Sequence, residues 1–341
     1  MARTVTIRDI ADRAGCSVST VSRALADNPR IAKGTRSEIQ KIAADLGYRP
    51  NIQARSLRSS RSMTIGITVP SLVNPYFADM ATIIQRTAAV AGYSTLIANT
   101  NEDAVELRRA LDVMSGQRVA GCIVVPHEGA EEQITELEVR GVPVVLVDRS
   151  VPGLDFYSVE SDPYPGIHDA VQLLAQRGHR RIGYLSGPAS TSTGRDRLRV
   201  FEEVCLTLGV DGSHVFPGGY EQDIGREGAY TLLDEGIETL IAGDSMMTAG
   251  VIEACHRRGL FIGDDVALVG FDTHPVFALQ PRPLTVIDQD VEGMASRAFE
   301  ILLKRIKGAP PRSRQHRIPT TLEIRESTPY RETEMSKGGG K

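Results

Sequence analysis

Apolar positions at helical spacing predict a small all-α unit in the first 50 residues of the chain. The helices are expected over 7–14, 18–25 and roughly 36–46. A residue able to cap a helix precedes each of them: Thr6, Ser17 and Thr35. Glu38 follows Thr35 by three residues, which predicts a capping box, and Gly47 ends the third helix.

From residue 63 onward, short apolar runs alternate with amphipathic stretches. The predicted strands are 64–69, 94–98, 121–125, 144–147, 181–185, 239–242, 266–270 and 285–287. The predicted helices between them are 76–91, 104–116, 131–140, 164–176, 198–208, 225–234 and 247–258. This alternation predicts βαβ units, and the number of strands favours an α/β body of two doubly wound parallel-sheet subdomains. The chain is expected to cross between them near 161–162, 288–291 and 319–321.

Polar and aromatic residues follow the ends of several predicted strands, where such folds bind ligands. They are Asn74, Tyr76, Phe77, Asp148, Arg149, Asp244, Asp272 and Gln289, joined by Arg197. Carboxylates accept hydrogen bonds from sugar hydroxyls, Arg and Gln donate them, and an aromatic face covers the apolar side of a sugar ring. The set therefore predicts a sugar-like effector pocket.

Each of these assignments has a structural alternative. Tyr76 and Phe77 begin a helix and could be ordinary core residues. Asp148 and Arg149 could form a surface turn, and Asp272 could cap the segment after it. Arg197 stands between two other arginines, at 195 and 199, so the pocket position could be displaced by two.

Charge divides the chain in the same way as the hydrophobic pattern. The 341 residues carry 39 Lys and Arg against 43 Asp and Glu, yet residues 1–61 hold twelve basic and five acidic residues. A basic head on an acidic body suggests that the head binds a polyanion, although a solvated basic face would look the same. The N-terminus lacks the apolar stretch of a signal peptide, and no run is long enough to span a membrane, so a cytoplasmic protein without membrane contact is expected.

The second predicted helix carries the most specific motif. A helix, a glycine turn and a second helix that opens with small polar residues form a helix-turn-helix, whose second helix can enter the DNA major groove. The string VTIRDIADRAGCSVSTVSRAL, then GYRPN and ARSL, resembles the LacI/GalR family of bacterial transcription regulators. The similarity continues through GHRRI, VGFD and PLT in the body. Asn-Pro-Tyr-Phe, followed later by Asp-Arg, is most similar to the ribose-repressor branch, whereas Asp244-Ser245 stands where many members carry Asn-Asp.

The resemblance implies where DNA would be bound. It assigns DNA contacts to Thr6, Ser17, Val18, Ser19, Thr20, Ser22, Arg23, Asn51, Ala54 and Leu57. Arg23 would hydrogen bond a guanine edge, and Val18 would either contact a thymine methyl or only pack. Leu57, on a hinge helix, would be inserted into the minor groove and kink the DNA.

The family also implies a domain plan and partners. The plan is a DNA-binding domain at 1–50, a hinge and linker at 51–62, and a periplasmic-binding-protein-like body at 63–330 with a disordered tail at 331–341. The first subdomain of the body would comprise 63–161 and 291–319, and the second 162–290 and 320–330. A homodimer is expected to bind a near-palindromic operator and to be released by a small aldose or its phosphate, with ribose as first choice.

Other functions remain open at this point. The same architecture could use a purine or nucleoside as co-repressor, and the sequence does not fix the sign of the response. A sugar-active enzyme or transport protein is a third possibility. Walker A, G-x-G-x-x-G, nucleophile-elbow and metal-binding histidine motifs are all absent, so we expect no enzyme, cofactor or metal site.

Overall fold

The computed structural model describes residues 5–25, 27–48 and 62–331, and the chain divides into two units, 1–61 and 62–341. The first unit contains α1 (Ile7–Ala14), α2 (Val18–Leu25) and α3 (Lys33–Asp45). Their apolar faces meet in a small core formed by Ile10, Ala11, Val21, Ala24, Ile39 and Ala43. The predicted hinge helix and nearly all of the predicted tail lie outside the described residues.

The ends of the head helices follow the sequence only in part. At α1 the predicted cap is present: Thr6 and Asp9 form a reciprocal capping box, and Gly15 ends the helix in a left-handed conformation. The predicted capping box of Thr35 and Glu38 is wrong. Residue 32 precedes the first turn of α3 and makes no side-chain cap, and the Arg36 amide already donates to its carbonyl oxygen. Thr35 therefore lies inside the first turn of the helix.

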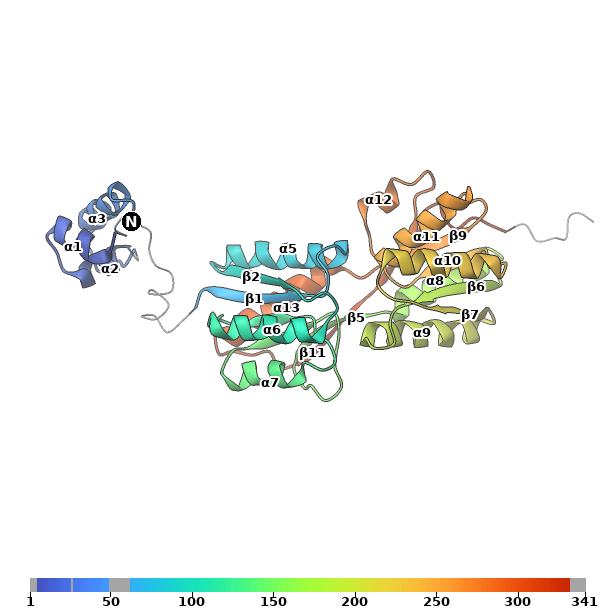
Figure 1. Cartoon of the computed structure of the whole chain (residues 1–341), viewed down its shortest axis with the longest axis horizontal. Helices are drawn as coiled ribbons and strands as arrows, with labels where there is room; N and C mark the ends of the chain where they lie inside the picture. Colours follow the sequence, from blue (N-terminus) through green and yellow to red (C-terminus); the bar gives the residue numbers. More distant parts are fainter. Residues whose placement is uncertain (1–4, 26, 49–61, 332–341) are drawn as a thin grey trace, which may run out of the picture. The chain divides into compact units, whose positions relative to one another are not determined.

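The second unit contains two separate six-stranded sheets (Figure 1). The first has the order β11-β5-β4-β3-β1-β2 and the second the order β12-β10-β9-β8-β6-β7. Strands of the first sheet are β1 (Thr64–Val69), β2 (Ser94–Asn99), β3 (Cys122–Val124), β4 (Val144–Val147), β5 (Tyr157–Asp162) and β11 (Gln315–Pro319). Strands of the second are β6 (Arg181–Ser186), β7 (Asp211–Pro217), β8 (Thr239–Ala242), β9 (Ala267–Phe271), β10 (Thr285–Asp288) and β12 (Thr321–Glu323).

Helices cover both faces of each sheet, which buries the continuous apolar runs of the central strands. The first sheet is covered by α5 (Pro75–Val90) with α13 (Val291–Ile306), and by α6 (Ala104–Gly116) with α7 (Glu131–Val139). The second is covered by α8 (Tyr164–Gln176) with α9 (Ser192–Leu208), and by α10 (Gln222–Asp234) with α11 (Ser245–Arg258). The short α12 (Pro275–Ala278) follows β9. We call these two layered assemblies the first and second lobe.

The chain passes between the lobes three times. It enters the second lobe after β5, returns to the first after β10, and enters the second again between β11 and β12. All strand pairs are parallel except β10 with β12, which is antiparallel. The two predicted parallel-sheet subdomains are confirmed, and this edge pair is the one antiparallel pair among the described strands. The chain leaves β11 in the first lobe and enters β12 in the second almost at once, so β12 runs away from the crossing point. Its neighbour β10 runs toward the crossing point, and the two strands are therefore antiparallel.

The sequence pattern missed the polar parts of the second unit. Helix α9 begins six residues before its predicted start and α10 three residues before, because their first turns are polar. Helix α13 was not among the predicted helices, and neither β5, β7 nor β11 was predicted as a strand. These three strands include several polar residues and lack the apolar runs used to identify the others. Among the described helices, none is long and apolar enough to cross a bilayer.

Candidate DNA interface and effector cavity

One face of α2 is exposed because only the opposite face packs in the core of the head. Val21 and Ala24 are buried against α1 and α3. The predicted DNA contacts lie on the remaining surface: Ser17, Ser19 and Arg23 are exposed, and Thr20 and Ser22 are half-buried. Val18 is half-buried and packs on the core of the head, so packing is at least part of its role.

Hydroxyl groups and one guanidinium are held together at the start of α2. Ser17 Oγ accepts from the Thr20 amide at 3.1 Å and lies 2.7 Å from Ser19 Oγ. Arg23 Nε donates to the Ser19 carbonyl oxygen at 3.1 Å. The guanidinium is thereby directed along the exposed side of the helix, where it can reach a base edge. Asn51, Ala54 and Leu57 lie outside the described residues.

All nine predicted effector residues line one cavity between the lobes, which we call the inner cavity. Its lining consists of Asn74, Tyr76, Phe77, Asp148, Arg149, Thr193, Arg197, Tyr220, Asp244, Asp272 and Gln289. Sequence reasoning missed Thr193 and Tyr220. Tyr220 follows β7, a strand that was not predicted, and Thr193 lies in the first turn of α9, which was expected to begin later. The strand-end rule would have selected Tyr220 if β7 had been predicted, and Thr193 was missed because the first turn of α9 was not predicted as helical.

Polar side chains of the two lobes bind each other across the inner cavity. Asn74 caps α5 in the first lobe, and Asp244 caps α11 in the second. Asn74 Nδ2 donates to Asp244 Oδ2 at 3.3 Å, and Ser245 Oγ donates to Asn74 Oδ1 at 3.0 Å. Within the first lobe, Tyr76 OH donates to Asp148 Oδ1 at 2.9 Å. Tyr76 is therefore a cavity residue whose hydroxyl is aimed at a carboxylate, although its ring also packs in the core.

Arg197 is the organising cation of the second lobe. Its Nη1 donates to the Gly243 carbonyl oxygen at 2.7 Å and its Nη2 to Gln289 Oε1 at 2.6 Å. Gln289 Nε2 in turn donates to Asp272 Oδ1 at 2.5 Å. The guanidinium lies 4.2 Å from the centroid of the Phe271 ring. The neighbouring arginines, 195 and 199, pair with surface carboxylates, so the position displaced by two does not line the cavity.

Arg149 is the buried cation of the first lobe, and its partner is Glu102, which the sequence did not indicate. Its Nη1 and Nη2 donate to the two Glu102 carboxylate oxygens at 2.6 and 2.8 Å. Its Nε lies 3.5 Å from Asp148 Oδ2, and its guanidinium lies 5.3 Å from the centroid of the Tyr220 ring. Arg149 is only 2% exposed. The two residues at 148 and 149 are thus buried cavity groups and not a surface turn.

Burial governs the protonation of the acids in the inner cavity. Burial raises the pKa of Asp272 to about 7 and that of Asp244 to about 6, with the Arg197 charge opposing the shift in both cases. Burial also raises the pKa of Asp148, against the opposing charges of Arg149 and Arg197. A carboxylic acid that is partly protonated near neutral pH can donate a hydrogen bond as well as accept one.

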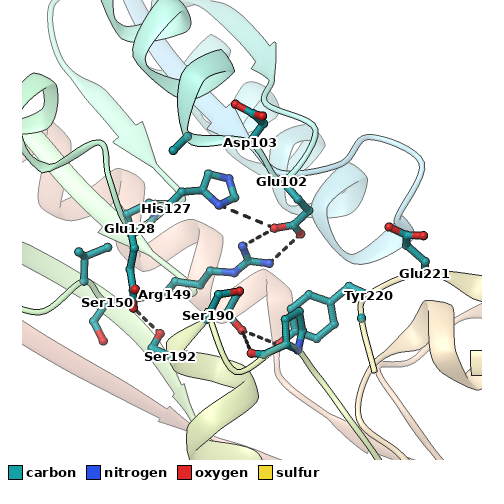
Figure 2. A pocket seen from close by; sticks show the side chains of 16 residues that line it. Glu102, Asp103, His127, Glu128, Arg149, Ser150, Ser190, Ser192, Tyr220 and Glu221 are labelled. Atoms are coloured by element: carbon teal, nitrogen blue, oxygen red, sulfur yellow. Dashed lines mark hydrogen bonds and ion pairs between the residues drawn. The ribbon is translucent and has the colours of Figure 1, made fainter. Parts of the chain in front are cut away.

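A larger outer chamber of about 340 Å³ adjoins the inner cavity, with Arg149 and Tyr220 lining both (Figure 2). Its other polar lining comes from Glu102, Asp103, His127, Glu128, Ser150, Ser190, Thr191, Ser192 and Glu221. A Cβ at Gly187 would lie 2.6 Å from the Tyr220 hydroxyl oxygen, so glycine is needed there for the tyrosine to reach this wall. Figure 2 shows Arg149 extending toward Glu102, with His127 beside them.

The inner cavity itself has a volume of about 20 Å³, room for about one water molecule. A sugar ring would need the lobes to separate or these side chains to rearrange. The hydrogen bonds that now join the two lobes are therefore those that ligand hydroxyls would replace. Binding of a ligand in this cavity would therefore change the contacts between the lobes.

Comparison with known proteins places the chain in a family. Residues 6–51 match the model of bacterial regulatory proteins of the lacI family, and residues 171–328 match a periplasmic binding protein-like domain. Catabolite control protein A of Priestia megaterium is 31% identical over 95% of this chain and 99% of its own length. The ribose operon repressor of Bacillus subtilis is also 31% identical, over 95% of this chain and 98% of its own.

Solved structures agree with these relatives. A probable LacI family transcriptional regulator from Corynebacterium glutamicum is 52% identical, with a TM-score of 0.72 over 78% of this chain and 100% of its own. The lac repressor dimer bound to operator and the anti-inducer ONPF is 25% identical, with a TM-score of 0.86 over 96% of this chain and 100% of its own. These relatives are transcriptional regulators and not enzymes. A helix-turn-helix head, a two-lobed α/β body and full-length similarity to such regulators lead to one conclusion: the chain belongs to the LacI family of bacterial DNA-binding transcription regulators.

Proposed function

We propose that the protein is a sequence-specific repressor of sugar-utilisation genes that is released from its operator by a small sugar-like effector. The observation that carries the proposal is the convergence of nine strand-end and helix residues from both lobes on one inner cavity. Ribose or a ribose-containing compound is the first choice. The Asn-Pro-Tyr-Phe and Asp-Arg sequences support that choice, and a ribose operon repressor is among the relatives.

The proposed division of labour follows the chain. Residues 1–50 would read the operator, 51–62 would form the hinge helix and linker, and 63–330 would bind the effector and form the dimer. Two copies would place their α2 helices in successive major grooves of a near-palindromic site, with half-site centres about 10 bp apart. Several Lys and Arg contacts to phosphate in each head would make binding strongly salt-dependent.

Effector binding would act through the lobes. A ligand that needs cavity residues from both lobes changes how the lobes sit against each other, and in the dimer this would move the two hinge segments apart. A helix of eight residues is unstable by itself, so a small change in hinge separation can melt it and release the DNA. Thermodynamic linkage requires that operator DNA weaken effector binding by the same factor.

Three measurements test the proposal. A thermal-shift screen of pentoses, hexoses, nucleosides and purines on the full-length protein should identify a ligand, with ribose or a riboside expected to raise Tm. Fluorescence anisotropy on a duplex selected from a random library should then show release of DNA by that ligand. Tighter DNA binding with a purine or nucleoside would instead establish a co-repressor. Sedimentation showing a monomer that binds one half-site as tightly as the full site would contradict the dimer.

A further inference from the structure

More carboxyl groups than guanidinium groups surround the inner cavity. Asp148, Asp244 and Asp272 are at most 7% exposed, and Glu102 adds a fourth carboxylate through its pair with Arg149. Only two guanidinium groups, those of Arg149 and Arg197, face these four acids among the described residues that line the cavity. Even with one acid protonated, the carboxylates outnumber the cations.

The guanidinium groups are also largely used by the protein itself. Arg149 gives both terminal nitrogens to Glu102, and Arg197 gives one each to Gly243 and Gln289. Arg149 and Arg197 each also have a buried Nε–H that makes no hydrogen bond among the described residues, and that of Arg149 lies 3.5 Å from Asp148 Oδ2. One Nε–H on each of two guanidinium groups that are otherwise bound to the protein suits hydroxyl or ring oxygens, whereas a phosphate is held by paired donors from a free guanidinium or from several amides.

Helix N-termini are the usual phosphate sites of such folds, and most of those at the cavities are closed here by side chains. Five helices begin at residues that line the two cavities. The N-cap of α10 is Glu221, a carboxylate that makes no capping hydrogen bond, and the other four helices have side-chain caps. Asn74 accepts from the Tyr76 amide, Asp244 from Met247, Thr191 from Gly194, and Asp103 from Val105. Two of these four caps are carboxylates, which add negative charge where an anion would otherwise find amide groups.

The lining of the outer chamber is also rich in acidic residues. Its lining includes Glu102, Asp103, Glu128 and Glu221, of which Glu102 is paired with Arg149 and Glu128 with Arg195. Burial and the nearby Arg149 charge lower the pKa of His127 to about 4, so this histidine is neutral at physiological pH. Arg149, already paired with Glu102, is then the one cation among the described residues that line the chamber. The chamber shares Arg149 and Tyr220 with the inner cavity, so a ligand that enters from this side meets the acidic lining first.

We infer that the effector is an uncharged polyhydroxylated compound and that the cavity rejects phosphate esters and carboxylates of the same skeleton. This inference rests on the proposed effector role of the cavity and narrows it. Buried carboxylates accept from ligand hydroxyls, and the Nε–H groups of Arg149 and Arg197 can donate to ligand oxygens. An anion in the same place would be buried against an excess of like charge without a free guanidinium to pair with, which is strongly disfavoured.

Matched ligand pairs test this with the full-length protein. Isothermal titration calorimetry would compare D-ribose with D-ribose 5-phosphate, adenosine with its 5′-monophosphate, and D-glucose with D-glucose 6-phosphate and D-glucuronate. In the pair whose parent binds, the anionic member should bind about 100-fold more weakly or worse. An anion that binds as tightly as its parent would overturn the inference and leave the effector role intact. If no member of any pair binds, the effector role itself fails, and the inference falls with it.

A charge reversal isolates the outer chamber. Glu221 is exposed and lines the chamber, whereas Glu202 is an exposed residue of α9 outside it. At low ionic strength, Glu221→Lys should reduce the discrimination against the phosphate ester several-fold, and Glu202→Lys should leave it unchanged. The affinity for the uncharged parent should change less than twofold in Glu202→Lys. An unchanged ratio in Glu221→Lys would overturn the role given to the chamber.

Discussion

Asp148 and Asp272 occupy equivalent positions in the two lobes. Each follows a central strand with a left-handed backbone, at φ 70° and 64°. Each also donates its amide to the neighbouring strand, Asp148 to the Val159 carbonyl oxygen at 2.9 Å and Asp272 to that of Ile287 at 2.8 Å. Both carboxylates line the inner cavity. Each lobe therefore offers one acid from the same kind of strand end, so a ligand between them would contact both lobes.

Loss of the second-lobe acid should separate effector response from DNA binding. Asp272→Ala removes the acceptor of Gln289 and one carboxylate of the inner cavity. We expect the variant to bind operator with unchanged affinity and to lose release by the ligand found in the thermal-shift screen. Anisotropy titrations with and without that ligand measure both quantities. A variant that still responds normally would move the effector site elsewhere on the body.

The raised pKa of Asp272 predicts a pH dependence of stability. Its pKa of about 7 in the folded protein lies above the value of 3.8 for an unperturbed aspartate, so the folded state holds the proton more tightly. Protonated Asp272 therefore contributes to the free energy of unfolding. This contribution is fully present below about pH 4 and is lost as the pH rises to about 7. Asp272→Asn should remove this loss. Between pH 5 and 8, the Tm of the variant minus that of the wild type should therefore increase, as measured by thermal unfolding. A constant difference would mean that Asp272 ionises normally.

Glu102 should act as a positioning residue for Arg149. Glu102→Gln removes the carboxylate from a two-point ion pair with a buried guanidinium, which should cost about 1–3 kcal/mol of unfolding free energy. We also expect weaker effector binding, because Arg149 loses its fixed orientation in the cavity. Glu106→Gln, which breaks the exposed pair with Arg109, is the matched control and should cost less than about 1 kcal/mol.

Urea unfolding and calorimetry with the identified ligand separate these effects. If Glu102→Gln lowers stability but leaves the affinity for the ligand unchanged, Glu102 has only a structural role.

Arg23 should contribute to sequence preference and not merely to affinity. Arg23→Ala should weaken operator binding by about 1–3 kcal/mol and relax the preference at one base-pair position. Lys41→Ala, on the exposed side of α3, is the control: any loss should be similar on all sequences. Binding to a library of single-base operator variants distinguishes the two results. A uniform loss with Arg23→Ala would assign Arg23 to the phosphate backbone.

The sequence by itself determined the fold class and most of the elements, because these signals are local. Short valine-rich apolar runs such as 144–147 indicate strands buried on both faces, and the helical spacing around Val21 indicates which side of α2 packs inward. The rule that ligands bind at strand ends then selected the cavity residues without any knowledge of contacts. Strand β7 is largely polar and was not predicted as a strand, so the residues that follow it were not considered and Tyr220 was missed.

Tertiary structure decided what each side chain does. Among three arginines spaced two apart, only Arg197 turns into the inner cavity, because its two terminal nitrogens meet Gly243 and Gln289, which come from distant parts of the chain. Glu102 finds Arg149 from 47 positions away, and Asn74 finds Asp244 from 170. The pattern of apolar residues determines which segments fold into which element. The charge balance of the cavity arises only when strand ends from two lobes are brought together, because burial and mutual proximity set the cost of each charge.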